Sequence, residues 1–223
     1  MSQSHIHSAP GIGEPHRAPR TADAYTEVMV PVYSPLDLLA VRAQGATVWD
    51  AAGKEYIDLS GGIAVNALGH CNPALIEALT AQAHRLWHIS NTYKSDSTLR
   101  LAGALIRLTF AERVFFANSG AEANEAAFKL ARRYGLQQSP RKYEIVSAQN
   151  SFHGRSLFTV SVGGQPKYSN GFGPAIEGIR HVPFNDLGAL EHAVSENTCA
   201  VVLEPVQGES GVLPATREYL ACA

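Results

Sequence analysis

The sequence predicts an α/β fold built around a mostly parallel sheet with helices on both faces. From about residue 97 onward, helical and strand patterns alternate along the chain, as they do in that architecture. The run at residues 199–203 is apolar throughout, which is typical of a parallel strand that is covered on both faces. With 223 residues, of which 45% are hydrophobic, the chain is long enough to bury a sizeable core.

Ahead of this region we expect a disordered head and a small subdomain. Residues 1–22 contain several His, Pro and Gly and lack the apolar core of a secretion signal. Residues 23–96 are expected to form an N-terminal subdomain with a linker helix. Two short strands at 47–49 and 56–59 flank a turn in it, and Asn72 caps a helix whose first residue is a proline.

The chain is expected to be the N-terminal portion of a longer protein. Residues 97–223, which carry the alternating helices and strands, are interpreted as the first part of a large domain. The last of them start a helix at the N-cap Thr216 and reach Ala223 without the Gly, Asn or Pro that usually closes a helix. We therefore expect the large domain to be truncated in this sequence.

The residues around Ser119 predict an anion site. Residues 114–117 are expected to form a buried strand that leads into an amphipathic helix running to Tyr134. Ser119 fits the N-cap of this helix, and Glu122, three residues later, completes a capping box. Gly120 lets the backbone approach a ligand, and the free N–H groups of the first turn favour a phosphate. A well-capped helix without a ligand is the alternative that this stretch alone leaves open.

Composition argues against several function classes. A net charge of −2 with 17% charged residues gives no electrostatic basis for binding nucleic acid or an anionic membrane. No apolar run approaches the ~18 residues that a membrane span needs. The three cysteines, Cys71, Cys199 and Cys222, are scattered and fit a reducing cytoplasm better than a disulfide framework. The sequence lacks a nucleotide-binding glycine motif and a Cys/His spacing typical of zinc, so we expect no metal site.

Three motifs, SGAEAN at 119–124, FHGR at 152–155 and EPVQGE at 204–209, resemble in order and spacing the class III pyridoxal-phosphate aminotransferases that act on ω-amino groups. GGIAVNALGH at 61–70 and GGQPKYS at 163–169 are similar to the acetylornithine and succinylornithine branch of that family. The resemblance extends over nearly the whole chain. It implies a fold-type-I transferase, of which this sequence holds the N-terminal subdomain and part of the large domain.

The resemblance also implies a site for pyridoxal 5′-phosphate. Gly120 and Ala121, together with the N-cap Ser119, would bind the phosphate of the cofactor, in agreement with the argument from the helix start. Phe152 would stack on the pyridine ring, and its neighbour His153 is assigned to the same site. A core aromatic residue is the alternative interpretation of Phe152.

Further residues are assigned to the cofactor and the substrates. Glu204 directly follows the strand at 199–203, and ligands of open α/β sheets bind at the carboxyl ends of strands, so Glu204 is placed in the cofactor site. By resemblance, Arg155 would bind the substrate carboxylate remote from the reacting amine, a task that suits its bidentate guanidinium group. Glu209 would hold or release a second arginine as amino donor and oxo acid alternate, and Tyr33 would line the substrate entrance.

No catalytic residue is assigned to this chain. Transamination needs a lysine that forms a Schiff base with the cofactor and an acid that keeps the pyridine nitrogen protonated. In the family both lie downstream of the position of Glu209. After the motif that ends here at Glu209, the family usually has two glycines, and Ser210 stands in place of the first of them. None of the lysines occurs in a context that resembles the Schiff-base segment: Lys54, Lys94, Lys129, Lys142 and Lys167.

The implied activity is the transfer of the δ-amino group of N2-acetyl-L-ornithine to 2-oxoglutarate in arginine metabolism. The motifs WHISN at 87–91 and GGQPKYS at 163–169 favour acetylornithine over the alternative donors, which are N2-succinyl-L-ornithine, ornithine and 4-aminobutyrate. The complete enzyme is expected to be a cytoplasmic homodimer. The rival interpretation is a catalytically inactive truncated chain that binds a full-length partner.

Overall fold

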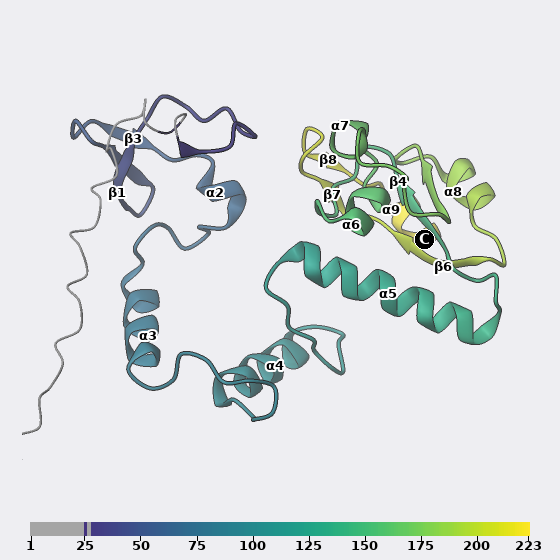
Figure 1. Ribbon diagram of the computed structural model, residues 1–223, viewed down its shortest axis with the longest axis horizontal. Helices are drawn as coiled ribbons and strands as arrows, with labels where there is room; N and C mark the ends of the chain where they lie inside the picture. Colours follow the sequence, from purple (N-terminus) through teal and green to yellow (C-terminus); the bar gives the residue numbers. More distant parts are fainter. Residues whose placement is uncertain (1–24, 26–27) are drawn as a thin grey trace, which may run out of the picture. The chain divides into compact units, whose positions relative to one another are not determined.

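The computed structural model describes Tyr25 and residues 28–223 (Figure 1). The chain divides into two compact units, Met1–Ser95 and Asp96–Ala223. The sequence places the division one residue later, after residue 96. The expected head, residues 1–22, lies outside the described residues.

The first unit contains a small antiparallel sheet. Its strands lie in the order β1-β2-β3, and their bounds are Ala40–Gln44, Thr47–Asp50 and Glu55–Ile57. Asp50 closes the turn between β2 and β3, because its carboxylate accepts the backbone N–H groups of Ala52 and Lys54, both at 2.9 Å. The same carboxylate accepts the hydroxyl of Tyr56 at 2.9 Å. The hairpin expected from the sequence is therefore present, with its second strand starting at Glu55.

Two helices follow in this unit. The single turn α2 (Gly61–Ala64) has positive φ angles at all four residues, 53°, 64°, 60° and 63° in chain order. For Ile63 this conformation costs about 1–2 kcal/mol, because the β-carbon approaches the next carbonyl oxygen. The helix α3 (Pro73–Ala83) begins as expected, since the side chain of Asn72 accepts the N–H of Ala74 at 3.0 Å.

Asp58 connects the hairpin to the residues before α3. Its carboxylate accepts the backbone N–H groups of Ser60 and Gly61, both at 3.0 Å, and pairs with the imidazole of His70 at 2.8 Å. The hydrogen bond from His70 is the main reason why the pKa of Asp58 lies below its usual range. These contacts fix the start of α2 to the hairpin.

The second unit is built on a parallel sheet of β4 (Glu144–Ala148), β5 (Ile179–Val182) and β6 (Thr198–Val202) in the order β5-β4-β6. A short antiparallel pair, β7 (Val206–Gln207) and β8 (Leu213–Pro214), follows β6. The helices of the unit are α4 (Asp96–Leu108), α5 (Gly120–Gln138), α6 (Leu157–Val162), α7 (Pro166–Ser169), α8 (Leu187–Ala193) and α9 (Arg217–Cys222).

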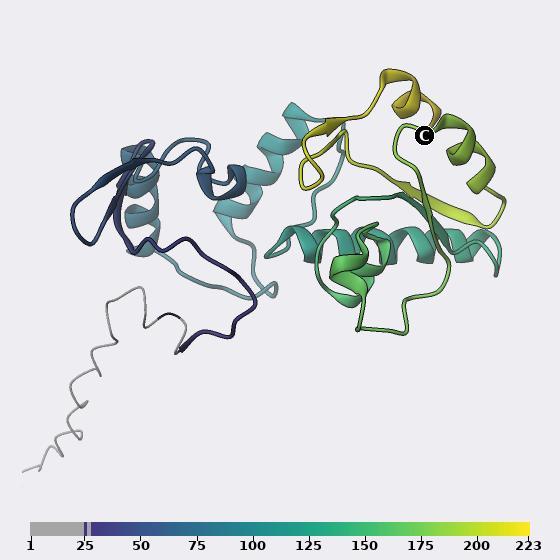
Figure 2. The ribbon, with the colours of Figure 1, turned by 90° about the horizontal axis from the view of Figure 1, so that it is seen from above.

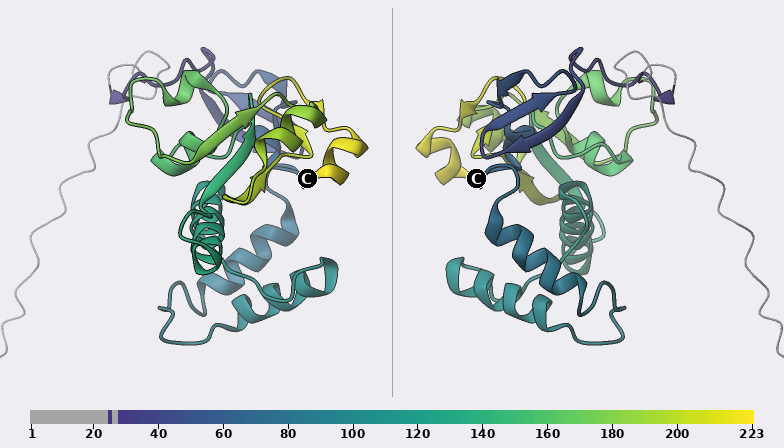
Figure 3. Two further views of the ribbon diagram at one scale, coloured as in Figure 1. Left: turned by 90° about the vertical axis from the view of Figure 1, so that its right-hand side faces the viewer. Right: turned by 90° about the vertical axis from the view of Figure 1, so that its left-hand side faces the viewer.

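Helices cover both faces of this sheet. Ile145 and Val146 are neighbours on β4, so their side chains point to opposite faces. Ile145 packs with Phe128 and Phe158, which come from α5 and α6. Val146 packs with buried residues from the other side, among them Tyr219 of α9. Figures 2 and 3 show the sheet between α5 on one side and α8 with α9 on the other. This arrangement confirms the α/β fold predicted from the sequence.

Two sequence-based expectations about strands are wrong. Residues 114–117 form no strand, and the side chain of Phe115 is 75% exposed. A strand exists only where a neighbour supplies hydrogen bonds, and no strand among the described residues pairs with this segment. The strand β6 is parallel as expected, but its residues are half-buried rather than buried, because β6 is an edge strand that pairs with β4 alone in the described sheet.

The helix α5 extends four residues beyond the expected end at Tyr134 and lies very close to the strands. A β-carbon on Gly135 would lie 2.2 Å from the carbonyl oxygen of Lys142 and 2.7 Å from the β-carbon of Cys199. Glycine is therefore required at position 135, and this contact sets the distance between α5 and the sheet.

Candidate functional site

The start of α5 has the expected cap. The side chain of Ser119 accepts the N–H of Glu122 at 3.2 Å. The carboxylate of Glu122 reaches back to the N–H of Asn118 at 2.6 Å, one residue earlier than in a standard capping box. Gly120 is exposed, and a β-carbon there would have no heavy atom within 4 Å. The first turn therefore presents N–H groups and the positive end of the helix dipole to open space.

The loop after β4 packs against this helix start. Gly154 has a φ of 129°, and a β-carbon there would lie 2.9 Å from the β-carbon of Ala121 and 2.6 Å from the hydroxyl of Thr159. The side chain of Asn124 donates to the carbonyl oxygen of His153 at 2.8 Å. The sequence FHGR is thus held on the first turns of α5 by a glycine that allows close approach and by a hydrogen bond from the helix.

His153 lies inside a buried polar network. Its side chain is 6% exposed, and its Nε2 lies 3.2 Å from the hydroxyl of Ser147. Ser151 is 3.3 Å from Ser147 and accepts the N–H of Gly164 at 3.1 Å. Burial lowers the pKa of His153 to about 4, and the nearby His181 contributes in the same direction. The imidazole is therefore neutral near pH 7 and positions the loop.

Glu204 connects the end of β6 to the same loop. Its carboxylate accepts the backbone N–H of Phe152 at 3.1 Å. Burial raises the pKa of Glu204, the hydrogen bond from Phe152 opposes the rise, and the negative charge of Glu209 adds to it. Glu204, two residues after the last residue of β6, thus lies beside Phe152, the residue expected to stack on a cofactor.

Tyr168, in the short helix α7, contacts three of the predicted site residues and is absent from the sequence-based set. Its ring meets the ring of Phe152 edge to face, with centroids 5.7 Å apart. The guanidinium carbon of Arg155 lies 5.0 Å from the centroid of the Tyr168 ring. The hydroxyl of Tyr168 donates to the carboxylate of Glu209 at 3.4 Å. The single signal in the sequence was its place within GGQPKYS, which gave no role for one residue.

Two further hydrogen bonds join the segment after Glu204 to the loop after β4. The buried Gln207 donates from Nε2 to the carbonyl oxygen of Gln149 at 2.9 Å, while its Oε1 is buried without a hydrogen-bond partner. The hydroxyl of Ser210 donates to the carbonyl oxygen of Asn150 at 2.6 Å. The sequence did not single out Gln207, and it treated Ser210 as a departure from the family.

The second unit thus brings together most of the predicted residues. A continuous set of contacts runs from the helix start through the FHGR loop to the end of β6 and the segment behind it: Ser119, Gly120, Ala121, Phe152, His153, Arg155, Glu204 and Glu209. Tyr33 belongs to the first unit and is exposed there.

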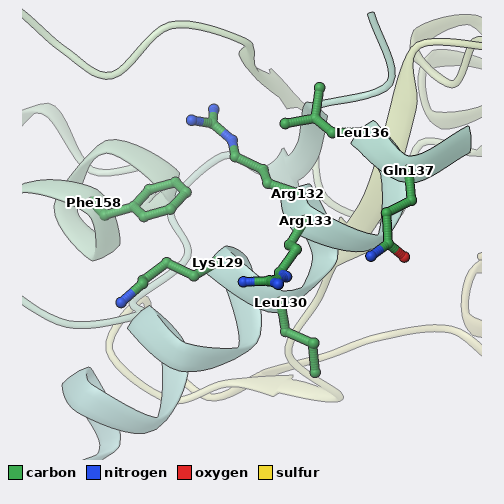
Figure 4. Close-up of a pocket in the computed structure, with 7 residues that line it drawn as sticks. All are labelled: Lys129, Leu130, Arg132, Arg133, Leu136, Gln137 and Phe158. Carbon is green, nitrogen blue, oxygen red and sulfur yellow. The ribbon is translucent and has the colours of Figure 1, made fainter. Parts of the chain in front are cut away.

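A separate hollow of the second unit lies elsewhere. It is lined by residues of the middle and end of α5 and by Phe158, and Figure 4 shows Lys129 and Arg133 among these lining residues. Lys129 is nine residues from Gly120, which is about 13 Å along a helix axis. The lysine of α5 is therefore remote from the helix start, and this hollow is not the candidate site.

Within the described ranges, no group of three or more His, Cys, Asp or Glu side chains is placed to hold a metal ion. In the same part of the chain, no helix combines the length and apolar character that a membrane crossing requires.

Comparison with known proteins gives relatives at high identity. Acetylornithine aminotransferase 1 of Pseudomonas syringae pv. tomato is 65% identical over 206 residues, which are 92% of this chain and 51% of that protein. A protein of Pseudomonas aeruginosa named succinylornithine transaminase/acetylornithine aminotransferase is 62% identical over 92% of this chain and 51% of its own length. The chain thus spans about half the length of the curated relatives it matches.

Solved structures share the fold. The ornithine aminotransferase from Toxoplasma gondii ME49 superposes with a TM-score of 0.86 at 30% identity, over 91% of this chain and 50% of that one. The N-acetylornithine aminotransferase from Stenotrophomonas maltophilia K279a gives 0.70 at 42% identity, over 85% and 47%. Residues 29–223 match the family described as Aminotransferase class-III. The chain therefore belongs to the class III aminotransferases, a family of pyridoxal-phosphate-dependent transaminases with the fold-type-I architecture.

Proposed function

We propose that this chain supplies the N-terminal half of an enzyme that moves the δ-amino group of N2-acetyl-L-ornithine, or of N2-succinyl-L-ornithine, to 2-oxoglutarate. The observation that carries the proposal is the contact of one aromatic residue, Tyr168, with Phe152, Arg155 and Glu209. Phe152 would face the cofactor ring, Arg155 would bind one substrate carboxylate, and Glu209 would take part in the switch between the two substrates. Relatives named for acetylornithine and succinylornithine, 65% and 62% identical, support the choice of donor.

The phosphate end of the site fits pyridoxal phosphate. The space next to Gly120 is open, and Gly120 and Ala121 lie in the first turn of α5, where N–H groups have no helical partner. Ser119 would hold the turn in place through its bond to Glu122. When bound, pyridoxal phosphate supplies the electron sink that transamination requires.

The ring end depends on Phe152 and its two neighbours in space. Glu204 accepts the backbone N–H of Phe152 and thereby fixes the backbone of the stacking residue. His153, neutral and buried, would anchor the loop from the other side through Ser147. We assign both to positioning Phe152 against the cofactor ring.

The substrate end would use opposite charges around one aromatic ring. Arg155 stacks on Tyr168 and would bind the remote carboxylate of the donor and one carboxylate of 2-oxoglutarate. Glu209, held by the hydroxyl of Tyr168, would hold or release a second arginine that the resemblance implies and this chain does not contain. Tyr33, from the N-terminal subdomain at 23–96, would line the entrance.

The complete enzyme is proposed to be a cytoplasmic homodimer that acts on small molecules and binds neither nucleic acid nor membrane. The net charge of −2 supports the exclusion of nucleic acid, and the scattered cysteines support a reducing compartment. The cofactor-linked lysine of the family would come from outside residues 1–223.

The test uses a reconstituted enzyme, defined as residues 1–223 joined to the second half of the Pseudomonas syringae relative. With 2-oxoglutarate as acceptor, we expect turnover with acetylornithine and succinylornithine at a higher kcat/KM than with ornithine or 4-aminobutyrate. The 223-residue chain alone should show no turnover and no borohydride-reduced cofactor adduct at a single lysine. Preference for ornithine or 4-aminobutyrate would overturn the donor assignment, and a stoichiometric adduct mapped to Lys129 would overturn the assignment of catalysis to the missing half.

A further inference from the structure

One side of α5 meets the loop that carries the FHGR sequence. Ala121, Asn124 and Glu125 are half-buried, whereas Glu122 and Ala123 between them are exposed. Positions 121, 124 and 125 lie on the same side of a helix, because residues three and four apart in the chain are neighbours on the helix surface. The half-buried positions therefore form one surface, and the contacts of this surface with the loop are specific.

Two hydrogen bonds from this side of α5 enclose Arg155 along the chain. The side chain of Asn124 donates to the carbonyl oxygen of His153 at 2.8 Å, two residues before Arg155. The hydroxyl of Ser156, the residue directly after Arg155, donates to the carboxylate of Glu125. Arg155 is itself an exposed residue. The loop thus reaches solvent at Arg155, between two points at which it is attached to the helix.

The attachment at Ser156 bears on the position of the Arg155 guanidinium group. The guanidinium carbon lies 5.0 Å from the centroid of the Tyr168 ring, at the far end of a long side chain from its own backbone. Such a side chain has many rotamers, so its tip stays at one place only if its backbone is held as well. Without the bond between Glu125 and Ser156, the hydrogen bonds from α5 to the loop would stop at His153, ahead of Arg155.

The other end of the loop is held by a different element. Glu204, which follows β6, accepts the backbone N–H of Phe152 at 3.1 Å. The hydrogen bond from α5 to the carbonyl oxygen of His153 lies between Phe152 and Arg155 in the chain. A change at Ser156 is therefore separated from Phe152 by a fixed point, whereas no such point separates it from Arg155.

We propose that Glu125 is a positioning residue that holds Arg155, through Ser156, in the place where it binds a substrate carboxylate. The inference rests on the proposed function, because it takes Arg155 as the group that binds this carboxylate. Both substrates present a carboxylate to Arg155, so both depend on Glu125 to the same extent. The cofactor depends on the opposite end of the loop and is bound independently of Glu125.

The experiment measures KM and kcat for both substrates, and the dissociation constant of pyridoxal phosphate, in the reconstituted enzyme. Glu125→Ala should raise the KM for acetylornithine and for 2-oxoglutarate about fivefold, the equivalent of one net hydrogen bond. Both kcat values and the dissociation constant of the cofactor should stay within about twofold, because binding common to the ground state and the transition state is lost.

Three further variants test the bond itself. Glu125→Gln keeps an oxygen that accepts the hydroxyl of Ser156 and should keep the KM values of the unaltered enzyme. Ser156→Ala removes the same bond from the other side and should raise both KM values. The hydroxyl of Ser156 also lies 2.8 Å from that of Thr159, so the combined variant is compared with Ser156→Ala and should be no weaker.

The matched control is Glu191→Ala. Glu191 is an exposed glutamate within α8, which covers the other face of the sheet. This variant should leave both KM values unchanged. A second arm repeats Glu125→Ala in an Arg155→Ala background, where it should have no further effect, because Glu125 acts through Arg155.

The outcomes separate the two proposals. If Arg155→Ala alters both KM values and Glu125→Ala alters neither, the role of Glu125 is overturned and the proposed function stands. The role of Glu125 is also overturned if Glu125→Ala weakens cofactor binding as much as substrate binding, or if its effect persists undiminished with Ala at position 155. If Arg155→Ala itself changes neither KM, the carboxylate clamp fails, and the inference fails with it.

Discussion

Two segments lie next to the start of α5. The segment 109–118 precedes it in the chain, the loop 149–155 packs against it in space, and the two differ sharply in how they are held. The loop 149–155 is fixed by hydrogen bonds to neighbouring elements, including Asn150 to Gly164 at 2.9 Å, and it buries His153. The segment 109–118 leads directly into the helix and is almost entirely exposed, with Phe115 75% accessible to solvent. The loop 149–155 thus forms one wall of the candidate site and has its packing partners within this chain. The segment 109–118 forms the other wall, which the described residues leave largely uncovered.

The largest expected effect concerns the exposed wall. Apolar side chains on segment 109–118 and α5, together with the free edge of β6, favour aggregation. We expect the 223-residue chain to be insoluble, or to bind an apolar dye and unfold without a sharp transition. Co-expression with the second half of the Pseudomonas syringae relative should give a soluble complex. A monomer that unfolds cooperatively and binds no dye would show that the chain is self-sufficient.

Two glycines test the ordered wall against the open helix start. Gly154→Ala should destabilise the reconstituted enzyme by about 3 kcal/mol, because it adds a left-handed backbone penalty to a steric clash with Thr159 and Ala121. Gly120→Ala has free space for its β-carbon and should change the stability by less than about 0.5 kcal/mol. It should instead weaken pyridoxal phosphate binding, measured by absorbance titration. Equal stabilities for the two variants would contradict this contrast.

His153 gives a pH test of the same wall. Its pKa falls from 6.5 to about 4 on folding, so the folded state disfavours the proton. His153 therefore leaves the free energy of unfolding undiminished above pH 6.5 and lowers it as the pH falls toward 4. In that range the unfolded chain binds a proton at His153 and the folded chain does not. The loss should reach about 3 kcal/mol at pH 4. Denaturant unfolding of the reconstituted enzyme should show this loss, and His153→Gln should remove it.

The exposed His192 provides the control for this measurement. His192→Gln should leave the pH dependence unchanged. If His153→Gln and His192→Gln have the same pH dependence as the unaltered enzyme, His153 is not held neutral by burial.

A further expected effect concerns the substrate side of the loop. Arg155→Ala should weaken transition-state binding in both half-reactions by about 1.5–3 kcal/mol, since each substrate loses a charge-assisted contact. Arg133→Ala, at an exposed residue of α5 that lies away from the helix start, serves as the matched control. Single-turnover rates of Arg155→Ala within about twofold of the unaltered enzyme for both substrates would exclude Arg155 as the carboxylate clamp.

Local rules predicted the helix starts well. Asn72, Ser119 and Thr216 each cap a helix through a side-chain acceptor, because capping depends on residues within three positions. The strand expected at 114–117 failed for the opposite reason. Its apolar pattern reports that the segment suits a buried strand, but pairing requires a neighbour that no local pattern contains.

The contacts of the site show the same limit. The position of Glu204 at a strand end followed from the apolar run before it, and the structure brings Glu204 to Phe152. Tyr168 was missed because its partners lie 13 to 41 residues away along the chain. The bond between Ser210 and Asn150 spans 60 residues and could not be derived from the motif in which Ser210 stands.

The turn α2 has the handedness of a polypeptide built from D-amino acids. Its four positive φ angles are the mirror image of an ordinary helical turn, and Ile63 and Ala64 adopt them against their own chirality. A D-alanine at Gly61 or Gly62 would therefore stabilise the turn, by about 0.4–1 kcal/mol, because it restricts the unfolded chain to the conformation already in use. A semisynthetic protein could thus carry D-stereochemistry at these positions, which ordinary helices such as α5 would reject.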